Sequence, residues 1–291
     1  MAHKRKLKCL VTGGSGFLGS HVCDQLTEMG HSVTIFDKKK SKWKKSNQIM
    51  ITGNLLKSNQ IEKAVKNKDI IFHFAGLSDL NEALNQPKKS IMLNILGTVN
   101  LLEAARKYNI KRFIHASSIY VNSEQGGFYR SSKRATEDYI EEYKKRFDLN
   151  FTIIRFGSLY GERSDRSNGV KKVIETAIRD NKIIYYGSKK SIREYIHVQD
   201  AAKACIISMN NDFKNKHIIA TGNKKIKVKS FLTILKKIFN DKKKIIFINK
   251  KKHGHYIKNP YTYKFRKGKK INLKSQIDFE LGLKKLIKEK I

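Results

Sequence analysis

Short apolar runs alternate with longer segments in the first half of the chain, and in those segments apolar residues recur every three or four positions. The runs predict strands at 7–12, 31–37, 49–52, 69–75, 111–117 and 151–156. The longer segments predict helices at 17–29, 58–67, 88–108 and 129–147. Repeated strand–helix units predict right-handed crossovers and an α/β fold with a doubly wound parallel sheet.

The pattern is less regular after Phe156. Helices are predicted at 170–179 and 230–239, and strands at 183–186, 192–197 and 244–248. We expect these elements to form a smaller C-terminal α/β lobe that alternates with segments returning to the main sheet. The predicted boundaries are 1–157 for the first domain, with 190–210 returning to it, and 158–189 and 211–291 for the lobe.

A glycine-rich turn follows the first predicted strand and opens the first predicted helix. Gly13 permits a tight turn, Gly16 lets the backbone approach a pyrophosphate, and Gly19 lets helix and strand pack closely. The turn therefore predicts a Rossmann-type dinucleotide-binding domain.

An acidic residue, Asp37, ends the second predicted strand. A carboxylate there can bond both ribose hydroxyls of NAD and repels a 2′-phosphate, so it favours NAD over NADP. Three lysines follow directly at 38–40 and leave some tolerance of NADP open. The alternative for Asp37 is an ordinary acid at a strand end.

Tyr129 and Lys133 lie four residues apart and face the same side of a predicted helix. The lysine charge is expected to lower the pKa of the phenol, which can then take a proton from a substrate hydroxyl. Other tyrosine–lysine pairs have this spacing, at 185/189, 186/190 and 263/267. Tyr129 differs because the hydroxyls of Ser117 and Ser118 precede it at a strand end, where sites lie in open α/β sheets.

Lysine and arginine number 62 against 25 acidic residues, for a net charge of +37. Nucleic acid, an anionic membrane surface or an acidic small substrate would each suit such a charge. Because the lysines are scattered through amphipathic segments, compositional bias is the favoured interpretation, and the three partner interpretations stay open. No run approaches the roughly 20 apolar residues that span a bilayer. Three widely spaced cysteines fit a reducing, cytoplasmic environment.

Several motifs together resemble the extended short-chain dehydrogenase/reductases, in particular the NAD-dependent epimerase/dehydratase family that acts on nucleotide sugars. These motifs keep their order and spacing over residues 7–205. They are the turn at 12–19, His73-Phe-Ala-Gly76, the segment 94–100, Ala116-Ser-Ser-Ile-Tyr-Val121, Tyr129-x-x-Ser132-Lys133, Arg155-x-x-x-Leu-Tyr-Gly161 and Arg193-Glu-Tyr-Ile-His-Val198 with Asp200.

The resemblance implies a role for individual residues. Ser118, Tyr129 and Lys133 would be catalytic, and Ser118, Ser158 and Arg193 would bind substrate, with Arg193 on its diphosphate. The implied NAD-binding residues are Gly13, Gly16, Phe17, Leu18, Gly19, Asp37, Asn54, Leu55, Phe74, Ala75, Gly76, Ser78, Asn94, Tyr129, Lys133 and Phe156.

The chain also departs from relatives at several positions. Dehydratases have Asp-Glu after the catalytic hydroxyl, whereas Ile119 and Tyr120 stand here, which disfavours 4,6-dehydration. Other departures are Asn54 for Asp, Asn122-Ser123 for Tyr-Gly, Ser158 for Asn, Glu162 for Pro, and a short segment between Ser118 and Tyr129. These departures predict either an unusual sugar specificity or an activity that has drifted from that of the family.

The resemblance favours 4-epimerisation of a nucleotide sugar through a 4-keto intermediate, with NAD regenerated in each cycle. The alternatives are an NAD(P)H-dependent reductase of 4-keto sugars and a retired enzyme that binds nucleic acid, against which the intact Ser118, Tyr129 and Lys133 argue. A homodimer is expected through helices 88–108 and 129–147. No metal site is predicted, and His253-Gly-His255 is interpreted as a polar loop.

Overall fold

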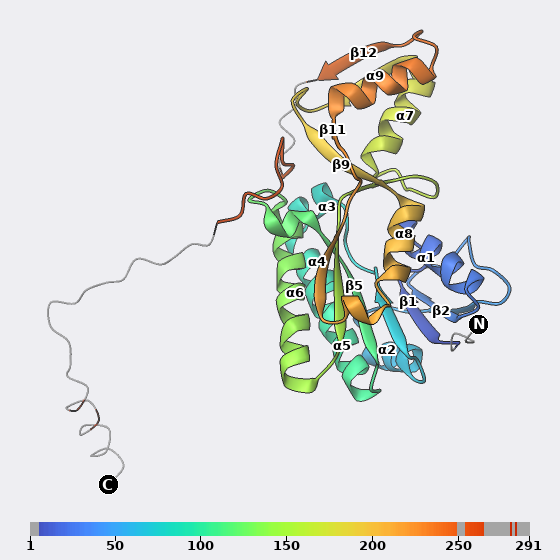
Figure 1. Ribbon diagram of the computed structural model, residues 1–291, viewed down its shortest axis with the longest axis vertical. Coiled ribbons are helices and arrows are strands. Elements are labelled where there is room, and N and C mark those ends of the chain that lie inside the picture. The colour runs from blue at the N-terminus through green and yellow to red at the C-terminus, as the bar shows by residue number, and fades with distance from the viewer. Residues whose placement is uncertain (1–5, 249–253, 265–279, 281–282, 284–291) are drawn as a thin grey trace.

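A seven-stranded parallel sheet forms the centre of the computed structural model, which describes residues 6–248, 254–264, 280 and 283 (Figure 1). The strand order is β10-β6-β5-β4-β1-β2-β3. The chain moves outward from β1 to β3, then returns to β4 on the other side of β1. The resulting reversal of strand order between β1 and β4 is where doubly wound sheets bind their ligands.

Strands and helices alternate through the main domain as predicted. The strands of this sheet are β1 Lys8–Thr12, β2 Ser32–Asp37, β3 Ile49–Thr52, β4 Ile70–His73, β5 Arg112–Ser118, β6 Phe151–Phe156 and β10 Lys216–Ala220. The helices around it are α1 Phe17–Glu28, α2 Ser58–Val65, α3 Leu80–Asn85, α4 Pro87–Ser90, α5 Gly97–Lys107, α6 Gly127–Phe147 and α8 Val198–Ile207. Short 3-10 turns span Ile119–Asn122 and Asn211–Phe213.

Each strand contributes alternate side chains to two apolar cores, one on each face of the sheet. Leu10, Phe113 and Ile153 pack with α2, α5 and α6 on one face. Their neighbours Val11 and Ile114 pack with α1 and α8 on the other face. Strands buried on both sides explain why the sequence shows continuous apolar runs instead of strict alternation.

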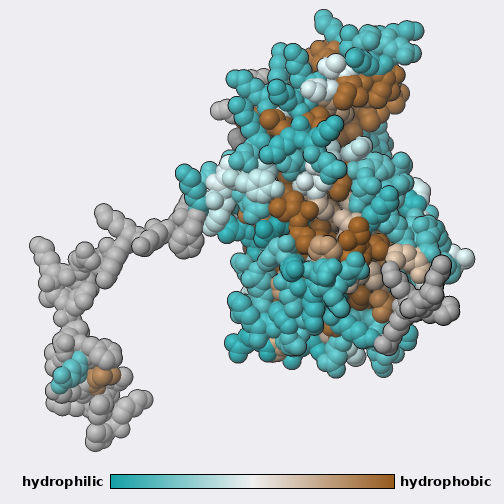
Figure 2. Space-filling view, in the orientation of Figure 1, coloured by the Kyte–Doolittle hydropathy of each residue, from teal (hydrophilic) through white to brown (hydrophobic). Residues whose placement is uncertain are grey.

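A smaller lobe lies above the carboxyl ends of the main strands, with its own apolar core around Val173, Ile183 and Leu232 (Figure 1). Its elements are β7 Ser158–Tyr160, α7 Gly169–Arg179, β8 Lys182–Tyr186, β9 Ile192–His197, β11 Lys225–Lys227, α9 Val228–Ile238 and β12 Lys244–Ile248. They form a β11-β9-β7 sheet and a parallel β12-β8 pair. The face seen in Figure 2 is mostly hydrophilic, with some apolar side chains gathered near α9.

Two details of the sequence prediction were wrong. The expected returning segment 190–210 contains β9, but β9 pairs with β7 and β11, while β10 from the expected lobe pairs with β6 in the main sheet. The helix expected at 88–108 is interrupted by a π-helical turn at Ile91–Leu96 between α4 and α5. Pairing partners and helical pitch depend on packing against distant segments, which local periodicity does not encode.

The glycine turn is closed by backbone contacts that leave no room for side chains. Gly13 has φ +72°, and its N–H donates to the Phe36 carbonyl at 2.9 Å. A Cβ on Gly19 would lie 2.3 Å from the Gly13 carbonyl oxygen. Helix α1 can therefore pack against the end of β1 because Gly19 has no side chain, while Gly13 is required by its positive φ and by the backbone of Ala75, 2.6 Å from where its Cβ would lie.

We predict that Gly19→Ala lowers the free energy of unfolding by about 2 kcal/mol or more, because the opposing atom is backbone and α1 must shift. Gly169→Ala is the matched control, since an added Cβ there meets nothing within 4 Å. Urea unfolding followed by circular dichroism compares the two variants. A Gly19→Ala variant as stable as Gly169→Ala would contradict the close packing.

Candidate functional site

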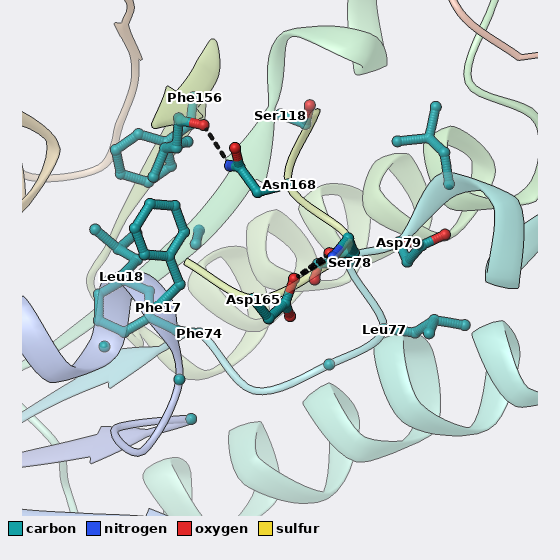
Figure 3. A pocket seen from close by; sticks show the side chains of 18 of the residues that line it. Phe17, Leu18, Phe74, Leu77, Ser78, Asp79, Ser118, Phe156, Asp165 and Asn168 are labelled. Atoms are coloured by element: carbon teal, nitrogen blue, oxygen red, sulfur yellow. Dashed lines mark hydrogen bonds between the residues drawn. The ribbon is translucent and has the colours of Figure 1, made fainter. Parts of the chain in front are cut away.

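A cavity of about 950 Å³ runs from the glycine turn to the lobe, across the carboxyl ends of β1, β4 and β5. Residues from distant parts of the chain converge on it, including Phe17 and Leu18 of α1, Phe74 after β4 and Asn168 before α7 (Figure 3). The location matches the reversal of strand order. A cavity of this size can hold a ligand of several linked groups.

The glycine-turn end of the cavity is organised by Asp37. Its carboxylate accepts the Ser15 and Lys39 N–H groups, each at 3.1 Å, and the Ser15 hydroxyl donates to the Lys39 carbonyl at 2.8 Å. Four lysines of the following loop also line this end, at positions 38, 39, 40 and 42. Asp37 therefore shapes the loop in addition to facing the cavity, a second role that the sequence did not suggest.

Every residue predicted to bind cofactor lines this cavity except Asn94. Asn94 is buried. Its Oδ1 accepts a hydrogen bond from the Leu77 N–H at 2.6 Å, and its Nδ2 donates to the Leu77 carbonyl at 3.1 Å and to the Ser132 hydroxyl at 2.9 Å. The structure thus corrects the direct-contact prediction for Asn94. Its side chain fixes the loop after β4, where Gly76, Leu77 and Ser78 face the cavity.

Ser118, Tyr129 and Lys133 all line the cavity, and Ser118 and Tyr129 are joined by a side-chain hydrogen bond. Ser118 ends β5, and the other two lie on the first turns of α6. Burial raises the pKa of Tyr129 to about 12, although a hydrogen bond with the Ser118 hydroxyl lowers it. The expectation of a lowered pKa for Tyr129 was therefore wrong for the structure described, because burial outweighs the hydrogen bond.

Lys133 is buried, and its ammonium donates to the Ala116 carbonyl at 2.8 Å. Burial lowers its pKa to about 8, and the nearby Glu137 carboxylate raises it. A buried amine is more easily deprotonated since the charged form loses its hydration.

Glu137 lies one helical turn beyond Lys133 and was missed by the sequence analysis. It forms an ion pair with Arg155 at 2.6 Å and accepts a hydrogen bond from Ser117, the neighbour of Ser118. The spacing of Lys133 and Glu137 on one helix face was the available signal, but Arg155 enters from another strand. This buried cluster fixes the end of β5 from which Ser118 projects.

The lobe supplies Arg193, Tyr195, Tyr185 and Phe231 to the far end of the cavity, and Ser158 lies at the junction. Arg193 is 8% exposed and donates to the Ile192 carbonyl at 2.8 Å. Its guanidinium stacks over the Tyr256 ring at 4.5 Å. A nearly buried guanidinium in this position can bind an anionic group of a ligand.

Two further cavity residues, Tyr120 and His255, were not assigned a site role from sequence. His253, the other histidine of the predicted polar loop, lies outside the described residues. Within 6–248 and 254–264 no cluster of three potential metal ligands occurs. No helix in the described part of the chain is long and apolar enough to cross a membrane.

The buried charge on Lys133 has a consequence for stability. Its pKa of about 8 lies below the usual 10.5, so the unfolded chain binds more protons between these pH values and stability rises with pH there. We predict that Lys133→Met raises the thermal midpoint at pH 7 by about 4 °C, and that the gap to the native protein shrinks above pH 8. Scanning calorimetry at several pH values measures both effects.

Lys145→Met is the control, because Lys145 lies exposed on the same helix. It should show neither the stabilisation nor the change in the gap with pH. The prediction would be contradicted if the stability gained by Lys133→Met over the native protein were smaller at pH 7 than at pH 10.

Comparison with known proteins agrees with this geometry. Residues 9–222 match the model of the NAD-dependent epimerase/dehydratase family. A UDP-N-acetyl-alpha-D-glucosaminuronate decarboxylase of Bacillus cytotoxicus is 30% identical over 249 residues, covering 75% of each chain. A UDP-glucose 4-epimerase of Schizosaccharomyces pombe is 30% identical over 258 residues, covering 72% of each chain.

Solved structures have the same fold. The UDP-glucose 4-epimerase of Thermotoga maritima, solved with UDP-glucose, superimposes with a TM-score of 0.80 at 25% identity. The match covers 87% of this chain and 88% of that one. The Thermus thermophilus UDP-glucose 4-epimerase in complex with NAD gives a TM-score of 0.76 at 21% identity, over 87% and 91% of the two chains. Because the family model matches residues 9–222 and two family relatives are 30% identical over more than two thirds of the chain, this protein belongs to the NAD-dependent epimerase/dehydratase family.

Proposed function

We propose that the protein is an NAD-dependent 4-epimerase of a nucleotide sugar. The observation that carries the proposal is a single cavity that joins the glycine turn, the Ser118–Tyr129–Lys133 group and Arg193. A dinucleotide at one end and a nucleoside diphosphate at the other would meet at the tyrosine. The epimerase relatives, which cover most of the chain, support the same reaction.

The residues present fit NAD. The first turn of α1 offers backbone N–H groups to a pyrophosphate at a helix N-terminus, and the cradle excludes a Cβ at Gly13 and Gly19. Asp37 faces the cavity where a ribose would lie. When bound, NAD accepts a hydride from the sugar and returns it.

Tyr129 is the proton acceptor in this mechanism. Its phenolate takes the proton of the sugar 4-hydroxyl while the carbon loses hydride, which leaves a 4-keto sugar. The Ser118 hydroxyl favours the phenolate by its hydrogen bond. The Lys133 ammonium lies one turn away and supplies positive charge below pH 8. The same groups return the proton when hydride adds to the other face.

Arg193 would hold the substrate diphosphate throughout, because a guanidinium binds phosphate oxygens in pairs. The ketone is planar at the reacting carbon, so rotation of the sugar about its link to the anchored nucleotide presents the opposite face. Return of hydride to that face inverts the configuration, and no net oxidation takes place. Ser158 lies at the junction of domain and lobe and would contact the same phosphates.

Relatives in this family catalyse other reactions, and the two residues after Ser118 distinguish dehydration from epimerisation. Ile119 and Tyr120 follow Ser118, so the acid pair that would eliminate water is missing from that place. A 4-keto sugar reductase would use the same three residues, and stoichiometric consumption of NADH during turnover would identify it. NMR of UDP-, dTDP- and GDP-sugars incubated with the protein and NAD detects inversion at C4 directly.

We predict that Tyr129→Phe lowers kcat for C4 inversion by about 100-fold or more, because the proton acceptor is lost. NAD affinity should change little, since the phenol is one of many cofactor contacts. Trp43, the single tryptophan, lines the cavity, so its fluorescence reports NAD binding independently of activity. Tyr139→Phe, exposed on the same helix, is the control. An active Tyr129→Phe enzyme would refute the catalytic assignment.

The proposal extends to a cytoplasmic homodimer. All three cysteines are free and buried, which suits a reducing compartment. Exposed apolar side chains gather on the π-helical turn and on α6, namely Ile91, Met92, Leu96, Phe128, Tyr139 and Phe147. Such a surface on neighbouring helices suits self-association.

We predict that the double variant Met92→Glu/Leu96→Glu is monomeric, because charges replace apolar contacts at the dimer surface. Ile234→Glu is the control, since Ile234 is as exposed but lies on α9 of the lobe. Light scattering after size-exclusion chromatography gives the mass of each. A native protein that runs as a monomer would refute the dimer.

A further inference from the structure

Tyr120 and His255 form a hydrogen-bonded pair on the cavity wall. The Tyr120 hydroxyl lies 2.9 Å from His255 Nδ1, and both residues line the cavity. Tyr120 belongs to the 3-10 turn after Ser118, whereas His255 comes from the segment 254–264. The contact therefore joins two parts of the chain separated by more than a hundred residues.

The pair lies beside the catalytic tyrosine. The rings of Tyr120 and Tyr129 meet edge-on with centroids 6.5 Å apart. Tyr256 packs on Tyr120 at 5.3 Å, and Arg193 covers Tyr256. Tyr120 therefore lies between Tyr129, which it contacts directly, and Arg193, which it reaches through Tyr256, and all three line one cavity.

Backbone hydrogen bonds hold the segment 254–264 at both ends. The Ile192 N–H donates to the Ile257 carbonyl at 2.7 Å, and the Thr262 and Tyr263 N–H groups donate to the Asn122 carbonyl, each at 2.9 Å. The Glu124 N–H donates to the Thr262 hydroxyl at 3.0 Å. His255 is thus fixed over the turn that carries Tyr120, and the pair is organised before a ligand binds.

The pair can exchange its hydrogen-bonding roles. If Nδ1 accepts, the Tyr120 oxygen accepts from a ligand; if Nδ1–H donates to that oxygen, the Tyr120 O–H donates to a ligand. Burial raises the pKa of Tyr120, so the phenol keeps its proton. The pair consequently suits a neutral group that presents either a hydroxyl or a carbonyl.

We propose that Tyr120 and His255 position the sugar ring during the reaction, donating to it in one orientation and accepting from it in the other. The inference rests on the proposed epimerase function, in which the 4-keto sugar rotates to present its other face while its nucleotide stays bound. The pair replaces an acid pair at the same place in the chain. In this proposal the Tyr120–His255 pair binds the sugar ring, whereas Arg193 binds the nucleotide diphosphate.

The test compares binding of a nucleoside diphosphate with binding of its sugar derivative. For whichever of UDP-, dTDP- and GDP-glucose the NAD-loaded native protein binds, calorimetry gives the affinity ratio to UDP, dTDP or GDP. Tyr120→Phe should weaken the sugar nucleotide by about five-fold and leave the diphosphate unchanged, as expected for one lost hydrogen bond. His255→Leu should do the same, and Tyr263→Phe on the same segment should do neither.

Turnover supplies a second readout. In Tyr120→Phe the loosely held 4-keto sugar escapes before reduction, so NADH should accumulate during incubation and kcat/KM should fall by about ten-fold. The positioning role would be overturned if Tyr120→Phe weakened binding of the diphosphate and of the sugar nucleotide equally, or weakened neither. Native protein that binds sugar nucleotides without converting them refutes the proposed function while the binding ratio still tests the pair. Absence of binding by native protein overturns both.

Discussion

The contact between the start of helix α1 and the end of strand β1 determines where the rest of the site can lie. A Cβ on Gly19 would approach the Gly13 carbonyl oxygen to 2.3 Å, so only glycine at position 19 permits the contact. The contact directs the N-terminus of α1 at the reversal point of the sheet. The glycine-turn end of the cavity lies at this helix N-terminus, where a pyrophosphate can be bound.

The reacting end of the cavity is built at an electrostatic cost. Tyr129 and Lys133 are both buried, and burial raises the pKa of the first and lowers that of the second. Glu137 partly offsets the cost by raising the pKa of Lys133, while its ion pair with Arg155 fixes the end of β5. Ionisable groups with pKa values perturbed by burial in this way cluster at functional sites.

The lobe completes the site by bringing segments from late in the chain over the carboxyl edge of the sheet. Arg193 comes from β9, and His255 from a segment that is hydrogen-bonded to the turn after Ser118. Both residues line the cavity, and they are linked through two aromatic rings, since Arg193 lies over Tyr256 and Tyr256 packs on Tyr120, the partner of His255. Sugar specificity in this chain is expected to reside in these contacts.

The sequence alone determined the doubly wound sheet, the dinucleotide turn and the Ser118–Tyr129–Lys133 group, because strand–helix periodicity and helical spacing fix them within short stretches. Tertiary structure decided that Asn94 braces Leu77 instead of facing the cavity, that β10 and not β9 joins the main sheet, and that Tyr120 meets His255. Each depends on which distant segments pack together, and burial likewise set the pKa of Tyr129. Local patterns record the period of a segment, whereas its partners are chosen by the packing of the whole chain.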